Sequence, residues 1–404
     1  MDTKRVFEGV KIADFAWIGV GPITVKYLGD HGATVVHVES ATRPDSLRLG
    51  QPAKGGVAGI NNSHFFANFN SSKYSLSLDL SKPEARETAR RLVQWADVVA
   101  ESYTPKAMRN WGLDYESLVK IKPDLVMVST CQQGQTGPHA LFAGAGNTGA
   151  SLAGFYSFTG WPDRGPGYVA GAYTDFISPR FLAAALVAAL DYRRRTGKGQ
   201  HIDQSQIEAG VQFAAVPVLD QTVNGRIMGR VGNRSPDHAP HGAYPCAGED
   251  RWCAIAVGSD EEWRGLRTAM GDPEWARDPG LDTLAGRKER EEELDRRLGE
   301  WTAGHAPEGL QDLLQGHGVA AGVVATTEDL YNDPQLQHRG HFRTLDHANI
   351  GPVPFDGPSF RLSKTPDSQF AAPTLGQHND MVLRDILGMT DAEVAALEAT
   401  GALV

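Results

Sequence analysis

The first forty residues carry a strand, a glycine turn, a helix and a second strand, and this order constrains the fold most. Residues 10–15 are strand-like, residues 19–22 read Gly-Val-Gly-Pro, residues 23–30 have a helical composition, and residues 33–39 form a second apolar run. A helix that connects two such strands makes a βαβ unit, in which the strands are parallel. The sequence therefore predicts a parallel sheet with a ligand site at the carboxyl ends of its strands.

Further cycles of helix and strand follow this unit. A helix is expected to begin at Ser81, with Glu84 at the capping-box position, and strands are expected at residues 98–100 and 125–129. A later helix is expected over residues 203–218. The first half of the chain is therefore predicted to be a Rossmann-like, doubly wound α/β domain.

The second half predicts a smaller domain and a return segment. A Gly- and Arg-rich stretch is typical of a linker, and it precedes a strand pair and a charged helical stretch. The chain then becomes Pro-rich and ends in a helix opened by a Thr390 to Glu393 capping box. We divide the chain into a large domain (residues 1–223), a linker (224–234), a small α/β domain (235–330) and a return segment (331–404).

Composition excludes several classes of protein. The formal charge of −10 argues against general nucleic-acid binding, and we find no apolar run as long as a membrane span. The three cysteines have neither Cys-x-x-Cys spacing nor a disulfide framework, and no His-Glu-x-x-His motif occurs. We therefore expect a cytosolic protein with small-molecule partners, no membrane or nucleic-acid partner and no metal site.

The candidate for chemistry is an aspartate set just before an expected helix start. Ser178 is a suitable N-cap, Pro179 suits the first helical position, and residues 181–190 are rich in Ala and Leu. Asp175 then lies near a helix N-terminus, where free N–H groups and the helix dipole favour an ionised carboxylate. Such a group is suited to act as a nucleophile or a base, and an ordinary capping aspartate is the alternative.

The turn at residues 19–22 imitates a dinucleotide-binding fingerprint. Glu39 ends the next strand, where an acid would hold a ribose, but Pro22 follows the second glycine and Thr24 replaces the third. The signal for NAD or FAD is therefore weak. The turn still offers a helix N-terminus to a phosphate or to the end of a nucleotide.

Short motifs occur in a fixed order along the whole chain. They include Lys73-Tyr-Ser-Leu-Ser-Leu-Asp79, Gly134-Gln-Thr-Gly137-Pro138, Thr174-Asp175, Thr196-Gly-Lys-Gly-Gln200 and Gly232-Asn-Arg234. In this series the chain resembles the class III coenzyme A transferases, the CaiB/BaiF family. The resemblance implies a large domain completed by the C-terminal segment, a small domain, and an interlocked homodimer or heterodimer.

The resemblance also implies roles for individual residues. Asp175 matches the family's nucleophile, which accepts an acyl group from an acyl-CoA as a mixed anhydride and then carries coenzyme A as a thioester. Coenzyme A is thus expected as a substrate, with no tightly bound cofactor. Its contacts fall by position on Ile18, Gly19, Val20, Arg43, Lys73, Ser102, Tyr103 and Arg109, and backbone N–H groups near Gly144 and Gly146 are candidates for stabilising oxyanions.

Two other functions stay open. The α-methylacyl-CoA racemases share the aspartate, but their Gly-His-Asp element falls here on Gly146-Asn147-Thr148, so the racemase histidine is missing. A catalytically silent, CoA-binding subunit of a heteromeric transferase is the second alternative. Residues 159–181 are most similar to the aryl- and alkylsuccinate CoA-transferases, so we expect succinyl-CoA as the donor and a carboxylic acid as the acceptor.

Overall fold

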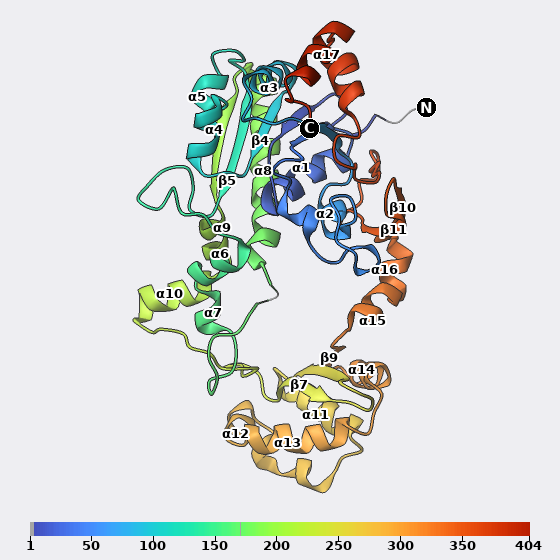
Figure 1. Cartoon of the computed structure of the whole chain (residues 1–404). Coiled ribbons are helices and arrows are strands. Elements are labelled where there is room, and N and C mark those ends of the chain that lie inside the picture. Colours follow the sequence, from blue (N-terminus) through green and yellow to red (C-terminus); the bar gives the residue numbers. More distant parts are fainter. Residues whose placement is uncertain (1–3, 170) are drawn as a thin grey trace. The chain divides into compact units, whose positions relative to one another are not determined.

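A six-stranded parallel sheet forms the centre of the computed structural model, which describes residues 4–169 and 171–404 (Figure 1). The strand order is β3-β2-β1-β4-β5-β6, which is the order of a doubly wound Rossmann sheet. The predicted fold class is therefore confirmed, and the order reverses between β1 and β4. The strands are β1 (Lys11–Asp14), β2 (Thr34–Glu39), β3 (Tyr74–Ser77), β4 (Val98–Glu101), β5 (Val126–Cys131) and β6 (Gln200–Ser205).

Helices cover both faces of this sheet. Alternate strand residues point to opposite faces, so Ile12 and Val35 pack in the core with α1 (Val20–Asp30) and α8 (Tyr173–Thr196). The neighbouring Ala13 and Val36 pack in the other core with α3 (Pro83–Trp95) and with the C-terminal helix α17 (Asp391–Ala399). The last helix of the chain thus completes the layer around the first strands.

Helix α8 is long and apolar enough, by length and composition, to cross a membrane. Its residues Leu182, Leu186 and Ala189 are buried in the core between the helix and the sheet. This burial is what the central helix of a folded domain requires.

The chain divides into two compact units. The large unit comprises Met1–Phe155, Val169–Ile227 and Gln335–Val404, and the small unit comprises Tyr156–Tyr168 and Met228–Pro334. The sequence analysis had placed residues 156–168 in the large domain, whereas the structure groups them with the small unit.

The small unit is built on a three-stranded antiparallel sheet in the order β7-β8-β9. Its core includes Trp263, Leu294 and Leu310 from the helices that follow the strands. Its elements are β7 (His241–Pro245), β8 (Trp252–Ala256), α11 (Asp260–Ala269), α12 (Leu284–Glu289), α13 (Glu291–Thr302), α14 (Pro307–Gly316), β9 (Ala320–Val323) and α15 (Thr327–Asn332).

Shorter elements complete the large unit, and the predicted start of α3 is wrong by one residue. Lys82, not Ser81, is the N-cap of α3, because Pro83 occupies the first turn; the Thr390 to Glu393 capping box is confirmed. The remaining elements of the large unit are α2 (His64–Phe69), α4 (Pro105–Trp111), α5 (Tyr115–Leu118), α6 (Gly146–Leu152), α9 (Gln206–Phe213), α10 (Ala215–Asn224), α16 (Pro334–Arg339), β10 (Phe342–His347), β11 (Gly351–Asp356) and a π-helix (Met381–Ile386). Helix α7 (Phe155–Phe158) begins at the last residue of the first large-unit segment and continues into the small unit.

Candidate active site

Asp175 lies in the first turn of α8, which begins at Tyr173. The predicted cap at Ser178 is wrong, since Pro179 lies inside the helix instead of opening it. Proline has no N–H, so it cannot donate to the carbonyl of Asp175 four residues earlier. The predicted position of Asp175 near a helix N-terminus is nevertheless confirmed, and the helix dipole there favours a negative charge.

Two glycines lie directly against the Asp175 carboxylate. A Cβ atom at Gly146 would come within 2.5 Å of Asp175 Cγ, and one at Gly19 would come within 2.9 Å of the same atom. A side chain at either position would force the Asp175 carboxylate to move, so glycine permits this close approach. Gly19 is the N-cap of α1 and Gly146 is the first residue of α6, so backbone from two further helix starts meets the carboxylate.

Burial governs the charge of this carboxylate. Asp175 is 8% exposed, and its burial raises the pKa of the carboxyl to about 6 although the Gly146 N–H donates to it. The effect of burial on the pKa thus exceeds that of the hydrogen bond. At neutral pH the group is mostly ionised yet poorly solvated, which is a reactive state for a nucleophile.

Helix α6 is fixed against α8 by close backbone packing. The Thr174 hydroxyl donates to the Gly146 carbonyl at 3.0 Å, and a Cβ at Gly149 would come within 2.6 Å of the same hydroxyl oxygen. Gly146 is therefore held at Asp175. Gly144 is exposed, and its neighbours are Gln132 and Thr148, so of the two predicted oxyanion positions only Gly146 is placed at the carboxylate.

The turn after β1 brings a strained residue beside this site. Ile18 has φ +66°, a left-handed conformation that costs a β-branched residue about 1–3 kcal/mol. The turn is tied to β4 because the Ser102 hydroxyl accepts from the Trp17 N–H at 2.7 Å and donates to the Trp17 carbonyl at 3.0 Å. Ser102 is thus engaged within the protein, and the Val20 side chain, which is 2% exposed, lies in the core.

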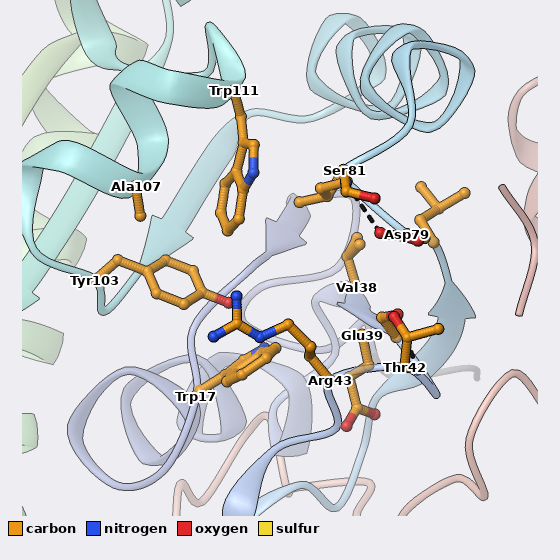
Figure 2. Close-up of a pocket in the computed structure, with 13 residues that line it drawn as sticks. Trp17, Val38, Glu39, Thr42, Arg43, Asp79, Ser81, Tyr103, Ala107 and Trp111 are labelled. Carbon is orange, nitrogen blue, oxygen red and sulfur yellow. Dashed lines mark hydrogen bonds between the residues drawn. The ribbon is translucent and has the colours of Figure 1, made fainter.

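A cavity of about 250 Å³ opens at the carboxyl ends of β1, β2 and β4, next to the point where the strand order reverses (Figure 2). Trp17, Tyr103 and Trp111 form an aromatic wall. The ring centroid of Tyr103 lies 5.5 Å from that of Trp17 and 5.3 Å from that of Trp111. Arg43 also lines the cavity, is exposed, and forms no ion pair within the described part of the chain. The cavity therefore combines flat apolar surface with one available cation.

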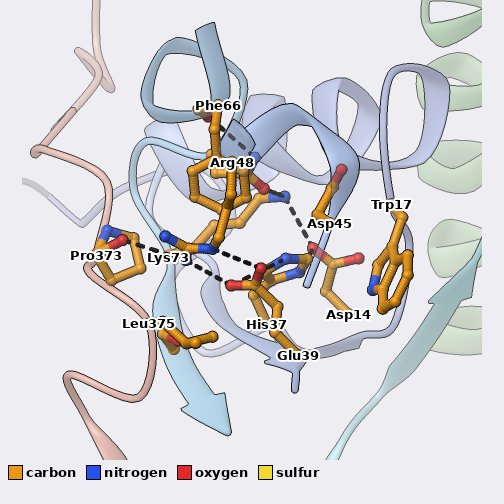
Figure 3. Close-up of polar contacts among 12 residues, drawn as sticks. Asp14, Trp17, His37, Glu39, Asp45, Arg48, Phe66, Lys73, Pro373 and Leu375 are labelled. Carbon is orange, nitrogen blue, oxygen red and sulfur yellow. Dashed lines mark hydrogen bonds and ion pairs between the residues drawn. The ribbon is translucent and has the colours of Figure 1, made fainter. Parts of the chain in front are cut away.

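Lys73 lies outside this cavity, in a cluster of buried charges (Figure 3). Its Nζ is 2.8 Å from Asp14 Oδ2 and 2.9 Å from Asn70 Oδ1, and its side chain is 0% exposed. His37 Nδ1 lies 2.9 Å from the same Asp14 oxygen. The structure therefore gives no support to the predicted contact of Lys73 with a nucleotide.

Glu39 lines the cavity, but its carboxylate is engaged elsewhere. Arg48 donates to both carboxylate oxygens, through Nε at 2.7 Å and through a terminal nitrogen at 2.6 Å, and its guanidinium covers the Phe66 ring. Such a bidentate pair leaves little capacity for a ribose hydroxyl. The resemblance of residues 19–39 to a dinucleotide fingerprint therefore ends at the level of topology.

Arg109 lines a different cavity, of about 140 Å³. That cavity also contains Glu101, whose pKa burial raises to about 7, and His201. Arg109 and Arg43 thus line two separate cavities and Lys73 lines neither, so the three predicted cationic contacts do not form one site.

Three residues of the site escaped the sequence analysis. Trp17 and Trp111 supply cavity walls, and Asp45 supports the Ile18 turn. The signal for Trp17 was available, because an aromatic residue directly after the first strand of a Rossmann sheet lies at the ligand-binding edge. Asp45 lies in an irregular segment, and nothing in its local sequence pairs it with Ile18.

The chain is similar to known proteins over most of its length. The family model described as CoA-transferase family III matches residues 7–379. The chain is 31% identical to a succinyl-CoA–D-citramalate CoA-transferase of Chloroflexus aurantiacus, covering 98% of this chain and 97% of that one. It is 31% identical to a succinate–glutarate CoA-transferase of Agrobacterium fabrum, covering 95% and 96%. A crystal structure of a CaiB/BaiF family protein from Brucella suis superposes with a TM-score of 0.86, at 31% identity over 95% of this chain and 100% of that one.

Proposed function

The chain belongs to CoA-transferase family III and is a CoA-transferase, and from that premise we propose that succinyl-CoA is its donor and Asp175 its nucleophile. The observation that carries the proposal is a buried carboxylate of raised pKa, fitted against the backbones of Gly19 and Gly146. A structural capping aspartate needs no such fit, since caps are normally solvated and accept from their own helix.

Each step of the proposed reaction transfers an acyl group between a carboxylate oxygen and the sulfur atom of coenzyme A. A carboxylate oxygen of Asp175 attacks the thioester carbonyl of the donor, which forms a mixed anhydride and releases the CoA thiolate. The thiolate then attacks the Asp175 carbonyl, which forms an aspartyl-CoA thioester and releases the donor as a free carboxylate. The acceptor carboxylate attacks this thioester, which forms a second mixed anhydride and releases the CoA thiolate again. The thiolate finally attacks the acceptor carbonyl of this anhydride, which yields the new acyl-CoA and releases the Asp175 carboxylate.

Oxyanions form at every attack, and the local backbone is suited to stabilise them. The first peptide units of α1 lie at Gly19, and their N–H groups have no partner within the helix. The N-terminus of α8 adds its dipole to the same point. Burial of Asp175 also limits attack by water, which would hydrolyse both the anhydride and the thioester.

We assign the nucleotide end of coenzyme A to the cavity beside the Ile18 turn. Adenine stacks well on indole and phenol rings, which Trp17, Tyr103 and Trp111 provide, and Arg43 suits a phosphate. Of the predicted contacts, this assignment retains Tyr103 and Arg43. It omits Lys73 and Arg109.

The acceptor is proposed to be a dicarboxylic acid. The support comes from the relatives, because the Chloroflexus and Agrobacterium enzymes are named for D-citramalate and glutarate. An aryl- or alkylsuccinate, which the sequence analysis favoured, is also a dicarboxylic acid. The interlocked dimer and the cytosolic location stay predictions.

Mass spectrometry of the protein after incubation with succinyl-CoA tests the proposal. We expect a CoA thioester on the peptide that contains Asp175, its conversion to a hydroxamate by hydroxylamine, and its discharge by a dicarboxylic acid. No adduct with a panel of acyl-CoA thioesters would contradict the proposal. Exchange of an α-proton in deuterated water would then indicate a racemase, and its absence a silent subunit.

A further inference from the structure

We propose that Asp45 is a positioning residue for the nucleophile, because its buried carboxylate holds the Ile18–Gly19 turn against Asp175. Asp45 contacts neither Asp175 nor the cavity; it acts through the backbone of the turn. The inference rests on the proposed function, since the position of the turn matters to catalysis only if Asp175 reacts.

The Asp45 carboxylate bridges two backbone segments. Its Oδ2 accepts from the Ile18 N–H at 2.8 Å, and its Oδ1 accepts from the Leu47 N–H at 2.9 Å. The side chain is 0% exposed, so both oxygens depend on these donors for their hydrogen bonds. A carboxylate is required, because an amide has one acceptor oxygen and would turn its NH₂ group towards a second N–H.

The N–H group that Asp45 binds belongs to Ile18, whose backbone has a strained conformation that needs support from its surroundings. A β-branched residue avoids a φ of +66°, because its Cβ and backbone crowd each other there. The hydrogen bond to Asp45 is a local restraint that opposes relaxation of this turn. The next residue is Gly19, whose backbone lies so close to Asp175 that a Cβ would come within 2.9 Å of the carboxylate carbon. A change at Ile18 therefore moves the surface against which Asp175 is packed.

The segment that carries Asp45 is itself anchored. Asp45 caps a short 3-10 helix, Ser46–Leu49, which includes Arg48. Arg48 forms the bidentate ion pair with Glu39 at the end of β2 (Figure 3). Arg48 also donates to the Asn61 side chain. The acid at the end of β2, which binds ribose in dinucleotide-binding folds, thus serves here to fix the support of the Ile18 turn.

A double-mutant cycle of Asp45→Asn and Ile18→Gly tests the proposal, with adduct formation and steady-state transfer measured on the full chain. We expect Asp45→Asn to lower kcat about 10- to 100-fold while the KM for succinyl-CoA changes less than about threefold. Glycine adopts positive φ without strain, so in the Ile18→Gly background the same substitution should lower kcat less than about threefold. If Asp45 contributed only to general stability, the losses of kcat caused by the two single substitutions would multiply in the double variant.

Asp30→Asn is the matched control. Asp30 is also 0% exposed and hydrogen-bonded, to Lys26 and Ser72, but it lies at the opposite end of α1. It should lower the unfolding temperature at least as much as Asp45→Asn and leave kcat unchanged. If Asp45→Asn does not fold, Asp45→Ser, which introduces no amide, replaces it in the cycle with the same expected coupling.

The outcomes separate this inference from the proposed function. Wild-type kcat in Asp45→Asn, or multiplicative losses in the cycle, would overturn the role of Asp45 and leave the nucleophile intact. Failure of the wild-type protein to form any adduct would overturn the proposed function and this inference with it.

Discussion

Two buried aspartates in the large unit show how surroundings set the role of a carboxylate. Asp14 has Lys73 and His37 within 2.9 Å; burial alone would raise its pKa, but these partners lower it to about 2. Asp175 has one backbone donor and forms no ion pair among the residues that the structure describes, and burial raises its pKa to about 6.

The difference separates a structural charge from a reactive one. The Asp14 carboxylate is stabilised by the Lys73 ammonium group and by a hydrogen bond with His37, so its lone pairs are held by neighbours and its nucleophilicity is low. The Asp175 carboxylate is deprived of water without receiving a counterion, so a reaction that disperses its charge is favoured. Each prediction below alters one side of this contrast.

Replacing Asp175 with alanine removes the reactive carboxylate and should have the largest effect. We expect transfer to fall by about 10⁴-fold or more, with coenzyme A still bound, because the nucleophile contacts the reacting carbon and not the nucleotide. Coupled assays of transfer and calorimetry of CoA binding measure the two quantities. Asp163→Ala changes an exposed aspartate, 75% accessible, and should leave both unchanged. Appreciable transfer by Asp175→Ala would mean that both aspartates are structural.

Lys73→Met removes the cation from the Asp14 cluster. It should lower the free energy of unfolding by about 3–5 kcal/mol, since it leaves a buried carboxylate without its principal counterion. Urea titration measures this change. Arg90→Met, at an exposed pair with Glu87, should change it by less than about 0.5 kcal/mol. Unchanged stability together with weaker CoA binding would instead restore Lys73 to a phosphate-binding role.

Gly146→Ala tests the close fit around Asp175. The added Cβ would come within 2.5 Å of Asp175 Cγ, so the carboxylate must move, and a displacement of about 1 Å costs roughly 100-fold in kcat. Single-turnover formation of the adduct is the measurement. Gly309→Ala, in α14 with no atom within 4 Å of the new Cβ, should leave the rate unchanged. Equal rates for both variants would show that the packing at Gly146 has no catalytic consequence.

Much of the sheet was predictable because buried parallel strands read as apolar runs. Residues 10–15, 33–39 and 125–129 carry that signal, and each predicted strand overlaps the observed one. Strand β6 was assigned in part to a helix, because its sequence Gln-His-Ile-Asp-Gln-Ser is polar at the edge of the sheet. The start of α8 was placed six residues late because Ser178 and Pro179 imitate a cap.

Local sequence predicts where a residue lies in its own element, but it does not predict tertiary pairing. The position of Asp175 near a helix N-terminus was predicted from the sequence, whereas Gly146 entered through the family resemblance, and the structure places its backbone at the carboxylate. Lys73 was assigned to a ligand because its partner Asp14, 59 residues earlier, is not identifiable from spacing. The sign of the Asp175 pKa shift depends on burial, which no local pattern reports, and the effect of burial outweighs that of the hydrogen bond from the Gly146 N–H.

The rate of adduct formation should depend on pH through Asp175. The ionised form attacks, and the pKa of about 6 lies above the ordinary 3.8, so activity is lost as pH falls through 6. At pH 5 we expect a rate about tenfold below the plateau reached above pH 7, measured in single turnovers. Glu101→Gln removes the buried group of pKa about 7 in the other cavity and should leave this profile unchanged. A rate of adduct formation that does not fall down to pH 5 would contradict this prediction. It would mean that the pKa of Asp175 is low, as expected for a paired carboxylate such as Asp14.

Arg43→Met should give the smallest effect, on binding alone. Arg43 is exposed, so its attraction for a phosphate is screened by water and salt, and we expect the Kd for coenzyme A to rise about 3- to 10-fold. The rate of adduct formation at saturating donor should not change, because the cation lies at the nucleotide end of the ligand and not at Asp175.

Arg109→Met is the matched control, since Arg109 lines the separate cavity, and it should bind coenzyme A as the wild type does. The difference between the two variants should shrink as ionic strength rises, because an exposed ion pair weakens when the Debye length falls. Weaker binding in Arg109→Met than in Arg43→Met would assign the phosphate to the other cavity and would move the nucleotide end of the ligand to the far side of α4.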